Sequence, residues 1–396
     1  MGKLIIHNEN IANKEEFIKI CPFNALETDG NTVSVNSACK MCKICVKNSK
    51  NNETEFAEEI APQIDKSAWN GILVYVDHIE GEIHPVTYEL IGKAKEMAVK
   101  VGYEVSCLFM GSGISDAADE LLYYGVDKVY VYDNVQLENF RIEPYTAVFE
   151  DCVNKIKPSV ILVGATTVGR QLAPRVAARF RTGLTADCTV LDIEENTDLV
   201  QIRPAFGGNI MAQICTPNNR PQMATVRYKV MESAEKSEKS GETVLCHIDE
   251  SKLKSNIEIL DVVKKEKVKS IEAADVIVVA GRGVKTKDDL AMIQTLCDKL
   301  DAELACTRPL VESGWVEARR QVGLSGRTVR PKLIITCGVS GAVQFSAGMN
   351  SSEKIFAINT DEKAPIFKVA HYGIVGDIYE IVPKLIQKID AVRGMK

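Results

Sequence analysis

The sequence predicts an α/β fold in which a small α+β domain precedes two α/β domains with parallel sheets. From residue 71 onward, short apolar runs alternate with segments whose apolar residues recur at helical spacing, which is typical of parallel strands covered by helices on both faces. The alternation begins again at residue 275, whereas the elements before residue 50 are short and separated by turn signals. We therefore expect domains at residues 1–60, 68–260 and 270–396, of which the last is doubly wound.

In the first α/β domain, strands and helices follow one another with short connections. The apolar run GILVYVDH predicts a buried strand at 71–78, and the spacing of Leu90, Ala94 and Met97 predicts a helix at 88–101. By the same reasoning we expect strands at 104–110, 128–132 and 159–164 and helices at 114–124, 144–156 and 170–181. Beyond residue 185 the helical pattern fades, which predicts further strands within 189–230.

A charged segment rich in Ser, Lys and Glu, residues 231–269, separates the two α/β domains and contains one strand-like piece, VLCHI. After it, the apolar run VIVVA predicts a strand that ends in a glycine turn at Gly281 and Gly283. The remaining elements expected are a helix at 288–300, strands within AELACTRP, KLIITC and KIFAINTD, and an amphipathic helix at 378–392.

Composition and charge exclude two classes of partner. The chain of 396 residues has a net charge of −6 with acidic and basic residues mixed along it, unlike the basic stripe of a nucleic-acid-binding protein. Its longest apolar runs are strand-sized, and no N-terminal segment has the features of a signal peptide. We therefore expect no nucleic acid and no membrane partner, and a cytoplasmic location.

Four of the twelve cysteines fall close together, as Cys21-Pro22 followed by Cys39, Cys42 and Cys45. In a reducing compartment such a group indicates metal ligation rather than disulfides. Bacterial ferredoxins with two clusters use a C-x2-C-x2-C-x3-C-P run for each cluster, and each run gives its last cysteine to the other cluster. The other eight cysteines are single, and we expect them to be buried small apolar side chains.

The missing cysteines of this pattern belong to one cluster. If Cys21 ends a first run, its companions would stand where the chain has Ile11, Lys14 and Phe17, and the second run would end at Ser49. We therefore expect a degenerate ferredoxin-like domain that binds one [4Fe–4S] cluster through Cys21, Cys39, Cys42 and Cys45. A four-cysteine zinc site is the alternative, although zinc usually takes two separated CxxC pairs.

Two loops of the C-terminal domain are suited to a ligand. GVSGAVQF at 338–345 places a turn of small residues between a strand and a helix, where backbone N–H groups and the positive helix end favour an anion such as a pyrophosphate. QVGLSG at 321–326 is polar and glycine-rich without hydrophobic periodicity, which indicates a ligand contact more than a core segment. Turns and helix caps would explain the residues singly, but they explain the set less well.

Together these segments resemble the alpha subunit of electron-transfer flavoproteins. The resemblance covers about residues 70–396 and rests on GATTVGRQLAPRVAARFRTGLTADC (164–188), RPAFGGN (203–209), GRG (281–283), TRP (307–309), GWVEARRQVGLSG (314–326), GVSGAVQF (338–345), AGMNSS (347–352), AINTD (357–361) and the segment from API to VAHYGIVGD (364–377). It implies that the C-terminal domain binds one FAD.

The resemblance also implies which residues hold the FAD. Arg282, Thr307 and Arg308 would line it, and the permanent positive charge of Arg308 over the isoalloxazine ring would favour the anionic reduced flavin. The Ser325 hydroxyl would bond to flavin N5 from a loop formed by Val322, Gly323, Leu324 and Ser325. The diphosphate and the ring edge would be held by Ser340, Gly341, Ala342, Val343, Gln344 and Phe345, and the adenosine side by Asn359, Asp377 and Ile378.

Two positions depart from the pattern of that family. The family often has Gln-Thr where this chain has Leu324 and Ser325, and serine keeps a hydroxyl for the N5 contact. The family often has a histidine near flavin O2 where this chain has Phe345, which has no hydrogen-bond donor. We therefore expect Phe345 only to touch the ring. The one-electron reduced flavin is then either less stabilised in this chain or stabilised by Arg308 or a backbone N–H.

The N-terminal domain indicates the type of flavoprotein, because the ordinary family member lacks it. It is similar to the extension found in alpha subunits of electron-bifurcating complexes, most of all the large flavoprotein subunit of a caffeyl-CoA reductase complex. This similarity implies a heterodimer with an NADH-oxidising beta subunit, ferredoxin and an acyl-CoA dehydrogenase or reductase as further partners, and a chain that is not catalytic alone. The alternatives are a lactate dehydrogenase-linked bifurcating protein, a non-bifurcating electron-transfer flavoprotein and an autonomous flavoenzyme.

Overall fold

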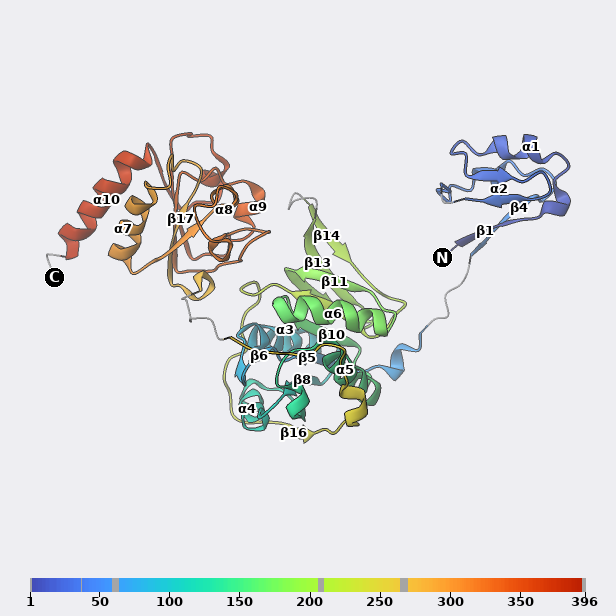
Figure 1. Ribbon diagram of the computed structural model, residues 1–396, viewed down its shortest axis with the longest axis horizontal. Coiled ribbons are helices and arrows are strands. Elements are labelled where there is room, and N and C mark those ends of the chain that lie inside the picture. Colours follow the sequence, from blue (N-terminus) through green and yellow to red (C-terminus); the bar gives the residue numbers. More distant parts are fainter. Residues whose placement is uncertain (1, 37, 59–63, 206–209, 264–269, 394–396) are drawn as a thin grey trace. The chain divides into compact units, whose positions relative to one another are not determined.

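The computed structural model describes residues 2–36, 38–58, 64–205, 210–263 and 270–393, and the chain divides into two compact units, Met1–Asp65 and Lys66–Lys396 (Figure 1). Residues 206–209 of RPAFGGN and 264–269 of the charged segment lie outside the described residues. In the described part of the chain, no helix has the length and hydropathy that a membrane span requires. The α/β fold class with parallel sheets is confirmed.

The described part of Met1–Asp65 consists of antiparallel strand pairs and short helices. β1 (Gly2–Ile6) pairs with β4 (Thr54–Glu58), and β2 (Leu26–Thr28) pairs with β3 (Val33–Val35). The Asp29 carboxylate closes the β2–β3 turn by accepting the N–H groups of Asn31 and Thr32 at 2.9 and 2.6 Å. The helices are α1 (Lys14–Phe17) and α2 (Ile44–Lys47), and the small core contains Leu4, Ile11, Phe17, Leu26, Val33 and Cys45.

The first α/β domain of Lys66–Lys396 is built on a parallel sheet. Among the described residues the sheet has seven strands in the order β11-β15-β10-β5-β8-β9-β16. In chain order these are β5 (Ile72–Tyr75), β8 (Val105–Gly111), β9 (Lys128–Asp133), β10 (Val160–Gly164), β11 (Leu184–Cys188), β15 (Gln222–Val226) and β16 (Glu242–Leu245). β5, β8, β10 and β15 are buried along their whole length, as expected of strands covered on both faces.

Helices cover both faces of this sheet (Figure 1). α3 (Val86–Val101) and α4 (Ser115–Leu121) pack on one face, where Leu90, Ala94 and Met97 of α3 are fully buried. α5 (Ile142–Ile156) and α6 (Thr167–Arg179) pack on the other face, in contact with a second apolar core. The expected helices are therefore present, with ends that differ by a few residues from the sequence-based bounds.

The region after α6 contains the further strands that the sequence predicts. β12 (Val190–Ile193), β13 (Leu199–Ala205) and β14 (Ile210–Ile214) form an antiparallel sheet of their own. β6 (His78–Ile79) and β7 (Glu82–Ile83) form a small hairpin after β5. The strand-like piece VLCHI overlaps the end of β16, which pairs with β9 at the sheet edge. Its residues Cys246 and Ile248, beyond the strand, pack against the core of one face.

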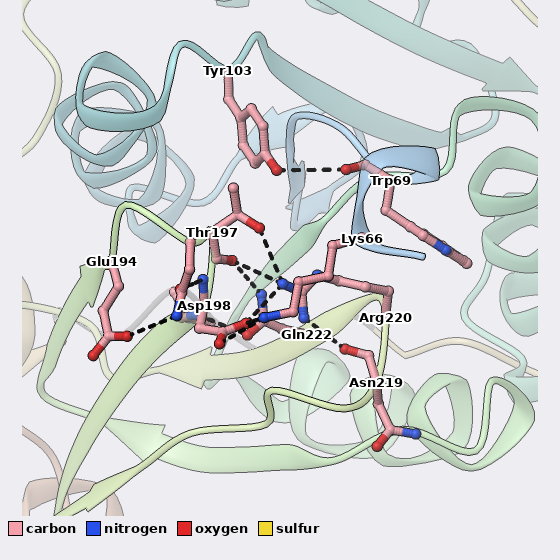
Figure 2. A network of polar contacts seen from close by, with 11 residues as sticks. Lys66, Trp69, Tyr103, Glu194, Thr197, Asp198, Asn219, Arg220 and Gln222 are labelled. Carbon is pink, nitrogen blue, oxygen red and sulfur yellow. Dashed lines mark hydrogen bonds and ion pairs between the residues drawn. The ribbon is translucent and has the colours of Figure 1, made fainter. Parts of the chain in front are cut away.

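A buried polar network holds the turn between β12 and β13 (Figure 2). Arg220, whose side chain is fully buried, donates to the Thr197 carbonyl at 3.2 Å and to the Asp198 carboxylate at 2.9 Å. Gln222 accepts the Leu199 N–H at 2.8 Å and donates to the Thr197 carbonyl at 2.9 Å. The network therefore ties this turn to the start of β15 by hydrogen bonds between buried polar groups.

Within residues 270–393, five parallel strands form the sheet of the second α/β domain, in the order β18-β17-β19-β20-β21. They are β17 (Val276–Ala280), β18 (Glu303–Cys306), β19 (Leu333–Cys337), β20 (Lys354–Asn359) and β21 (Tyr372–Val375). The chain passes from β17 to the edge strand β18 and then crosses back to β19, so the order reverses between β17 and β19. This is a doubly wound arrangement, in which ligands bind where the order reverses.

Helices on this second sheet complete the domain. α7 (Leu290–Leu300) and α10 (Ile378–Arg393) pack together on one face, with Leu310 of α8 (Arg308–Glu312) in the same core. α9 (Val343–Ser346) and the turn at Pro365–Lys368 belong to the core of the other face. β21 and α8 were not expected from the sequence, since β21 is an exposed edge strand and α8 is a short helix that follows β18 directly.

Candidate functional site

A cavity of about 830 Å³ lies at the carboxyl ends of the strands of the second sheet. It is lined by residues that follow β17, β18, β19 and β20 and by the residues that join β21 to α10, so it includes the reversal of strand order between β17 and β19. The predicted flavin residues that line it are Arg282, Thr307, Arg308, Val322, Gly323, Leu324, Ser325, Ser340, Ala342, Gln344, Phe345, Asn359, Asp377 and Ile378. Gly341 and Val343, also predicted, lie beside lining residues in the turn and at the start of α9.

The turns after β17 and β19 touch each other and form one wall of this cavity. The Gly281 N–H donates to the Cys337 carbonyl at 2.9 Å, and the Gly283 N–H donates to the Gly338 carbonyl at 3.0 Å. A side chain at Gly283 would place its Cβ 2.6 Å from the Gly338 Cα, so this approach requires glycine. The glycines predicted as a turn therefore let two backbone segments meet beside the cavity.

The QVGLSG loop is held by backbone hydrogen bonds to two neighbouring segments. The Val322 N–H donates to the Cys306 carbonyl at the end of β18 at 3.0 Å, and the Leu324 N–H donates to the Gln344 carbonyl in α9 at 2.8 Å. Val322 is buried, whereas Ser325 is exposed and lines the cavity. The loop therefore has an anchored side and a side that is open to a ligand.

Phe345 belongs to both the core and the cavity. It is 6% exposed and packs in the same apolar cluster as Val322 and Val339, and all three line the cavity. An apolar ring in this place can stack against or touch a ligand but donates no hydrogen bond. The expected contact between Phe345 and a flavin ring stays a prediction.

Charged side chains around the cavity are mostly cationic. Arg282, Lys285 and Arg308 line it together with one carboxylate, Asp377. Arg308 Nε donates to Glu312 Oε1 at 2.8 Å, and Asp377 accepts the Tyr379 N–H at 3.0 Å near the start of α10. This excess of positive charge favours a ligand that carries phosphate groups.

Several lining residues were not chosen from the sequence, although they lie within or beside the motifs. They are Gly283, Lys285, Pro309, Gln321, Gly338, Val339, Thr360 and Gly376. Most of them could have been predicted from their position near the end of a strand, because each stands next to or close to a predicted site residue in the sequence. Lys285 is the exception, since two residues separate it from the predicted Arg282 and its charge alone is common on a surface.

The four clustered cysteines line one small cavity of about 20 Å³ in Met1–Asp65. The Ala25 N–H donates to Cys21 Sγ at 3.4 Å. Burial is the main cause that raises the pKa of the Cys45 thiol, and the nearby Cys21 and Cys39 thiols add to it. Among the described residues, no group of three or more His, Cys, Asp or Glu side chains is arranged so that it could hold a metal ion.

The positions of the missing cysteines are occupied by other interactions. Ile11 and Phe17 are buried in the core of Met1–Asp65. Ser49 donates to Glu53 at 2.6 Å, and this bond, with N–H bonds to the same carboxylate, lowers the pKa of Glu53 to about 2. Packing and hydrogen bonding therefore account for three of the four positions without a metal.

Thiols near the large cavity are inert. Cys306 and Cys337 end β18 and β19 and are buried, and burial raises the pKa of each to about 12. A thiol with such a pKa remains protonated at neutral pH and is a poor nucleophile. These two cysteines therefore behave as small apolar side chains, as expected for the single cysteines. That expectation is wrong for Cys215, which is exposed, and Cys246 is only half-buried.

Comparison with known proteins places the chain in one family. The model of the electron transfer flavoprotein domain matches residues 72–250, and that of the electron transfer flavoprotein FAD-binding domain matches residues 270–350. The lactate dehydrogenase (NAD(+),ferredoxin) subunit LctC of Acetobacterium woodii is 56% identical over 395 residues, which cover 100% of this chain and 94% of that protein.

Two further relatives match a shorter part of the chain. The electron transfer flavoprotein subunit alpha of Thermoanaerobacterium thermosaccharolyticum is 43% identical over 327 residues, which cover 82% of this chain and 99% of that protein. The acryloyl-CoA reductase electron transfer subunit beta of Anaerotignum propionicum is 38% identical over 355 residues, which cover 82% of this chain and 97% of that protein. With its matched FAD-binding domain and its cavity at the strand reversal, the chain belongs to the electron transfer flavoprotein alpha-subunit family.

Proposed function

We propose that this chain is the alpha subunit of an electron-bifurcating complex. In this complex it passes electrons through one FAD between an NADH-oxidising beta subunit and a lactate dehydrogenase-type flavoenzyme. The observation that carries the proposal is the similarity to LctC, a protein named for lactate, NAD(+) and ferredoxin, because it extends over the whole chain. The match to the Thermoanaerobacterium alpha subunit has about the length of Lys66–Lys396 and leaves 18% of the chain unmatched.

The large cavity supports FAD as the bound group. Its cationic side chains, Arg282, Lys285 and Arg308, suit a diphosphate, and Val322, Leu324 and Phe345 offer an apolar surface to a flat ring. We keep the predicted assignment, in which Arg308 and Ser325 act near the isoalloxazine ring and Asn359, Asp377 and Ile378 act near the adenosine. Bound FAD supplies the redox chemistry, while these residues bind it, orient it and set the charge around it.

A [4Fe–4S] cluster at Cys21, Cys39, Cys42 and Cys45 is the second part of the proposal. Its support is that all four cysteines line one cavity and that an N–H bonds to Cys21 Sγ, a type of bond that tunes iron–sulfur clusters. A single zinc ion needs its ligands at about 2.3 Å from one point. The four thiols of a [4Fe–4S] cluster bind four different irons, so they need not converge on one point as zinc ligands do.

The partners follow from this assignment. We propose a heterodimer with a beta subunit, and ferredoxin and a flavoenzyme as electron partners in the cytoplasm. The sequence-based expectation of an acyl-CoA dehydrogenase or reductase partner becomes the second candidate. It keeps support from the 38% identity to an acryloyl-CoA reductase electron transfer subunit, but that match covers 82% of the chain rather than all of it.

The decisive experiment is anaerobic purification of the full chain together with the proteins bound to it. We expect about one FAD and about four irons in this chain. We further expect the complex to reduce NAD+ with lactate only when reduced ferredoxin is also supplied. Analysis of FAD and iron should be done on the chain after its separation from the other subunits.

Any other result of this experiment would support a different function. NADH-dependent reduction of an enoyl-CoA coupled to ferredoxin reduction would favour the acyl-CoA candidate. Electron transfer to a flavoenzyme without ferredoxin would identify a non-bifurcating electron-transfer flavoprotein. Oxidation of NADH by the isolated chain would contradict the relay role and favour an autonomous flavoenzyme.

A further inference from the structure

We propose that Gln321 is a positioning residue, which directs the hydroxyl hydrogen of Ser325 into the flavin cavity. The inference rests on the proposed function, because the acceptor of that hydrogen is N5 of the bound FAD. Gln321 was not among the residues that the sequence assigned to the flavin. Its role is to act through Ser325 rather than on the ring itself.

The hydrogen bond between the two side chains sets the direction. Gln321 Nε2 lies 2.8 Å from Ser325 Oγ. An amide nitrogen carries hydrogens and accepts none, so Ser325 Oγ must be the acceptor of this bond. The single hydrogen of the hydroxyl is therefore excluded from the Gln321 side and points elsewhere. Because Ser325 is exposed and lines the cavity, the open direction is toward the ligand.

Gln321 is itself held in place by its surroundings. Gln321 is 7% exposed. Its backbone carbonyl accepts the Arg327 N–H at 2.7 Å, and its backbone N–H donates to the Ala318 carbonyl at 3.1 Å. Gly326 packs against it so closely that a Cβ there would lie 2.3 Å from the Gln321 carbonyl oxygen and 3.0 Å from its Cγ. The loop thus folds back on Gln321, and this closure keeps the amide beside the serine.

Ser325 depends on such a partner more than a threonine would. Serine lacks the β-branch that restricts χ1, so its hydroxyl is free to occupy several rotamers. N5 of oxidised flavin accepts a hydrogen bond, whereas the N5–H of reduced flavin donates one. A hydroxyl that is fixed as a donor therefore stabilises the oxidised flavin relative to the reduced one. Gln321 should lower the reduction potential of the FAD by this route.

The test is a double-mutant cycle on the potential of the FAD in the heterodimer. The variants are Gln321→Glu, Ser325→Ala and the two combined, with the potential measured by spectroelectrochemistry. A carboxylate only accepts, so Gln321→Glu draws the Ser325 hydrogen away from N5. Its negative charge also acts on the flavin directly, and the Ser325→Ala background measures that effect alone.

We expect the two substitutions to be coupled. Gln321→Glu should shift the equilibrium between oxidised and reduced flavin toward the reduced form in the protein that has Ser325. We expect this shift to be about tenfold larger than in the Ser325→Ala background, a difference of about 30 mV for a two-electron couple. Gln321→Met, a neutral variant without this donor, should shift the equilibrium in the same direction and covers the case in which Gln321→Glu fails to fold. Gln387→Glu, an exposed change of the same charge on α10, should leave the potential unchanged.

Equal shifts from Gln321→Glu with and without Ser325 would overturn the proposal, since the substitution would then act only through the negative charge that it introduces. An unchanged potential in Gln321→Met would overturn it as well. Native protein that purifies without FAD and does not bind added FAD would instead overturn the proposed function. The FAD content of each variant, measured by absorbance, separates these two failures.

Discussion

Lys66 donates to both carboxylate oxygens of Asp198, at 2.7 and 2.9 Å, at the start of Lys66–Lys396 (Figure 2). Asp198 also accepts from Arg220 at 2.9 Å, and the Arg220 side chain is fully buried. Burial opposes ionisation of Asp198, but the bonds from Lys66 and Arg220 outweigh it and hold the pKa of this carboxyl below its usual value. One carboxylate thus balances a buried cation and a partly exposed one.

Asp198→Asn should therefore lower the free energy of unfolding strongly. We expect a loss of about 3–5 kcal/mol, because the Arg220 guanidinium would remain buried without a counter-charge. Denaturant unfolding of the full chain at neutral pH, followed by circular dichroism, measures the loss. In the native chain, the Asp198 carboxylate contributes to the free energy of unfolding at neutral pH. This contribution disappears as the pH falls through the depressed pKa of Asp198.

Two variants control this prediction. Lys66→Met should cost much less than Asp198→Asn, since Arg220 keeps its carboxylate. Asp192→Asn breaks the exposed ion pair between Asp192 and Lys100 and should have little effect. Equal losses from Asp192→Asn and Asp198→Asn would show that the buried arginine does not set the cost.

The buried Glu89 should give the stability a second dependence on pH. Its carboxylate accepts the Lys229 N–H at 3.1 and 3.0 Å and the Met231 N–H at 3.4 Å. Burial raises the pKa of Glu89 from 4.5 to about 7, although the N–H bonds oppose the change. Between pH 4.5 and pH 7, the folded state therefore binds a proton at Glu89 that the unfolded state has released. The stability that this proton provides is complete below about pH 4.5 and is lost as the pH rises through about 7.

Glu89→Gln should remove that dependence, because an amide does not titrate in this range. The measurement is the free energy of unfolding at pH 5 and pH 7.5 for the native chain and the variant. We expect the native protein to lose more stability than Glu89→Gln between the two values. The same loss in both would mean that Glu89 is ionised in the folded state already at pH 5.

Periodicity predicted the elements whose burial is regular, and it failed where burial is not. α3 was found because Leu90, Ala94 and Met97 face one core, and the fully buried β8 was found as an apolar run. β21 is exposed along its length at the sheet edge, so its sequence carries no burial pattern. α8 has only five residues and begins with Arg308 and Pro309, directly after β18.

The candidate site was predictable to the extent that it follows strand ends. Arg282, Thr307 and Ser340 follow β17, β18 and β19, so the parallel sheet alone brings them to one edge. The contact between Gln321 and Ser325 arises because the loop folds back on itself at Gly326, and such a tertiary contact has no period in the sequence. That is why the sequence pointed to Gln321 only as part of the QVGLSG loop and did not assign it to the flavin, as it did Ser325.

The cysteine assignment predicts a selective loss of iron. Cys42→Ser should reduce the iron and sulfide content of the anaerobically purified chain from about four per chain to well below that value, with FAD content unchanged. Cys215→Ser is the matched control, because Cys42 and Cys215 are both exposed but Cys215 lies outside the group of four. Full iron in Cys42→Ser, or equal losses in the two variants, would rule out this ligand set.

Gly341→Ala should weaken FAD binding although Gly341 does not line the cavity. Gly341 has a φ of +79°, and a Cβ there would lie 2.3 Å from the Ile366 nitrogen and 2.4 Å from its Cα. The Ile366 N–H donates to the Ser340 carbonyl at 3.0 Å, so displacing Ile366 would also move the turn that carries Ser340 into the cavity. Gly314→Ala is the matched control for Gly341→Ala. Gly314 has a φ of +68°, and no described atom lies within 4 Å of the Cβ that alanine would add there. Both variants bear the left-handed strain of about 1–2 kcal/mol, but only Gly341→Ala should lower FAD affinity, about tenfold or more, in a titration of the apoprotein with FAD. Similar affinities for both variants would show that the contact between Gly341 and Ile366 does not shape the site.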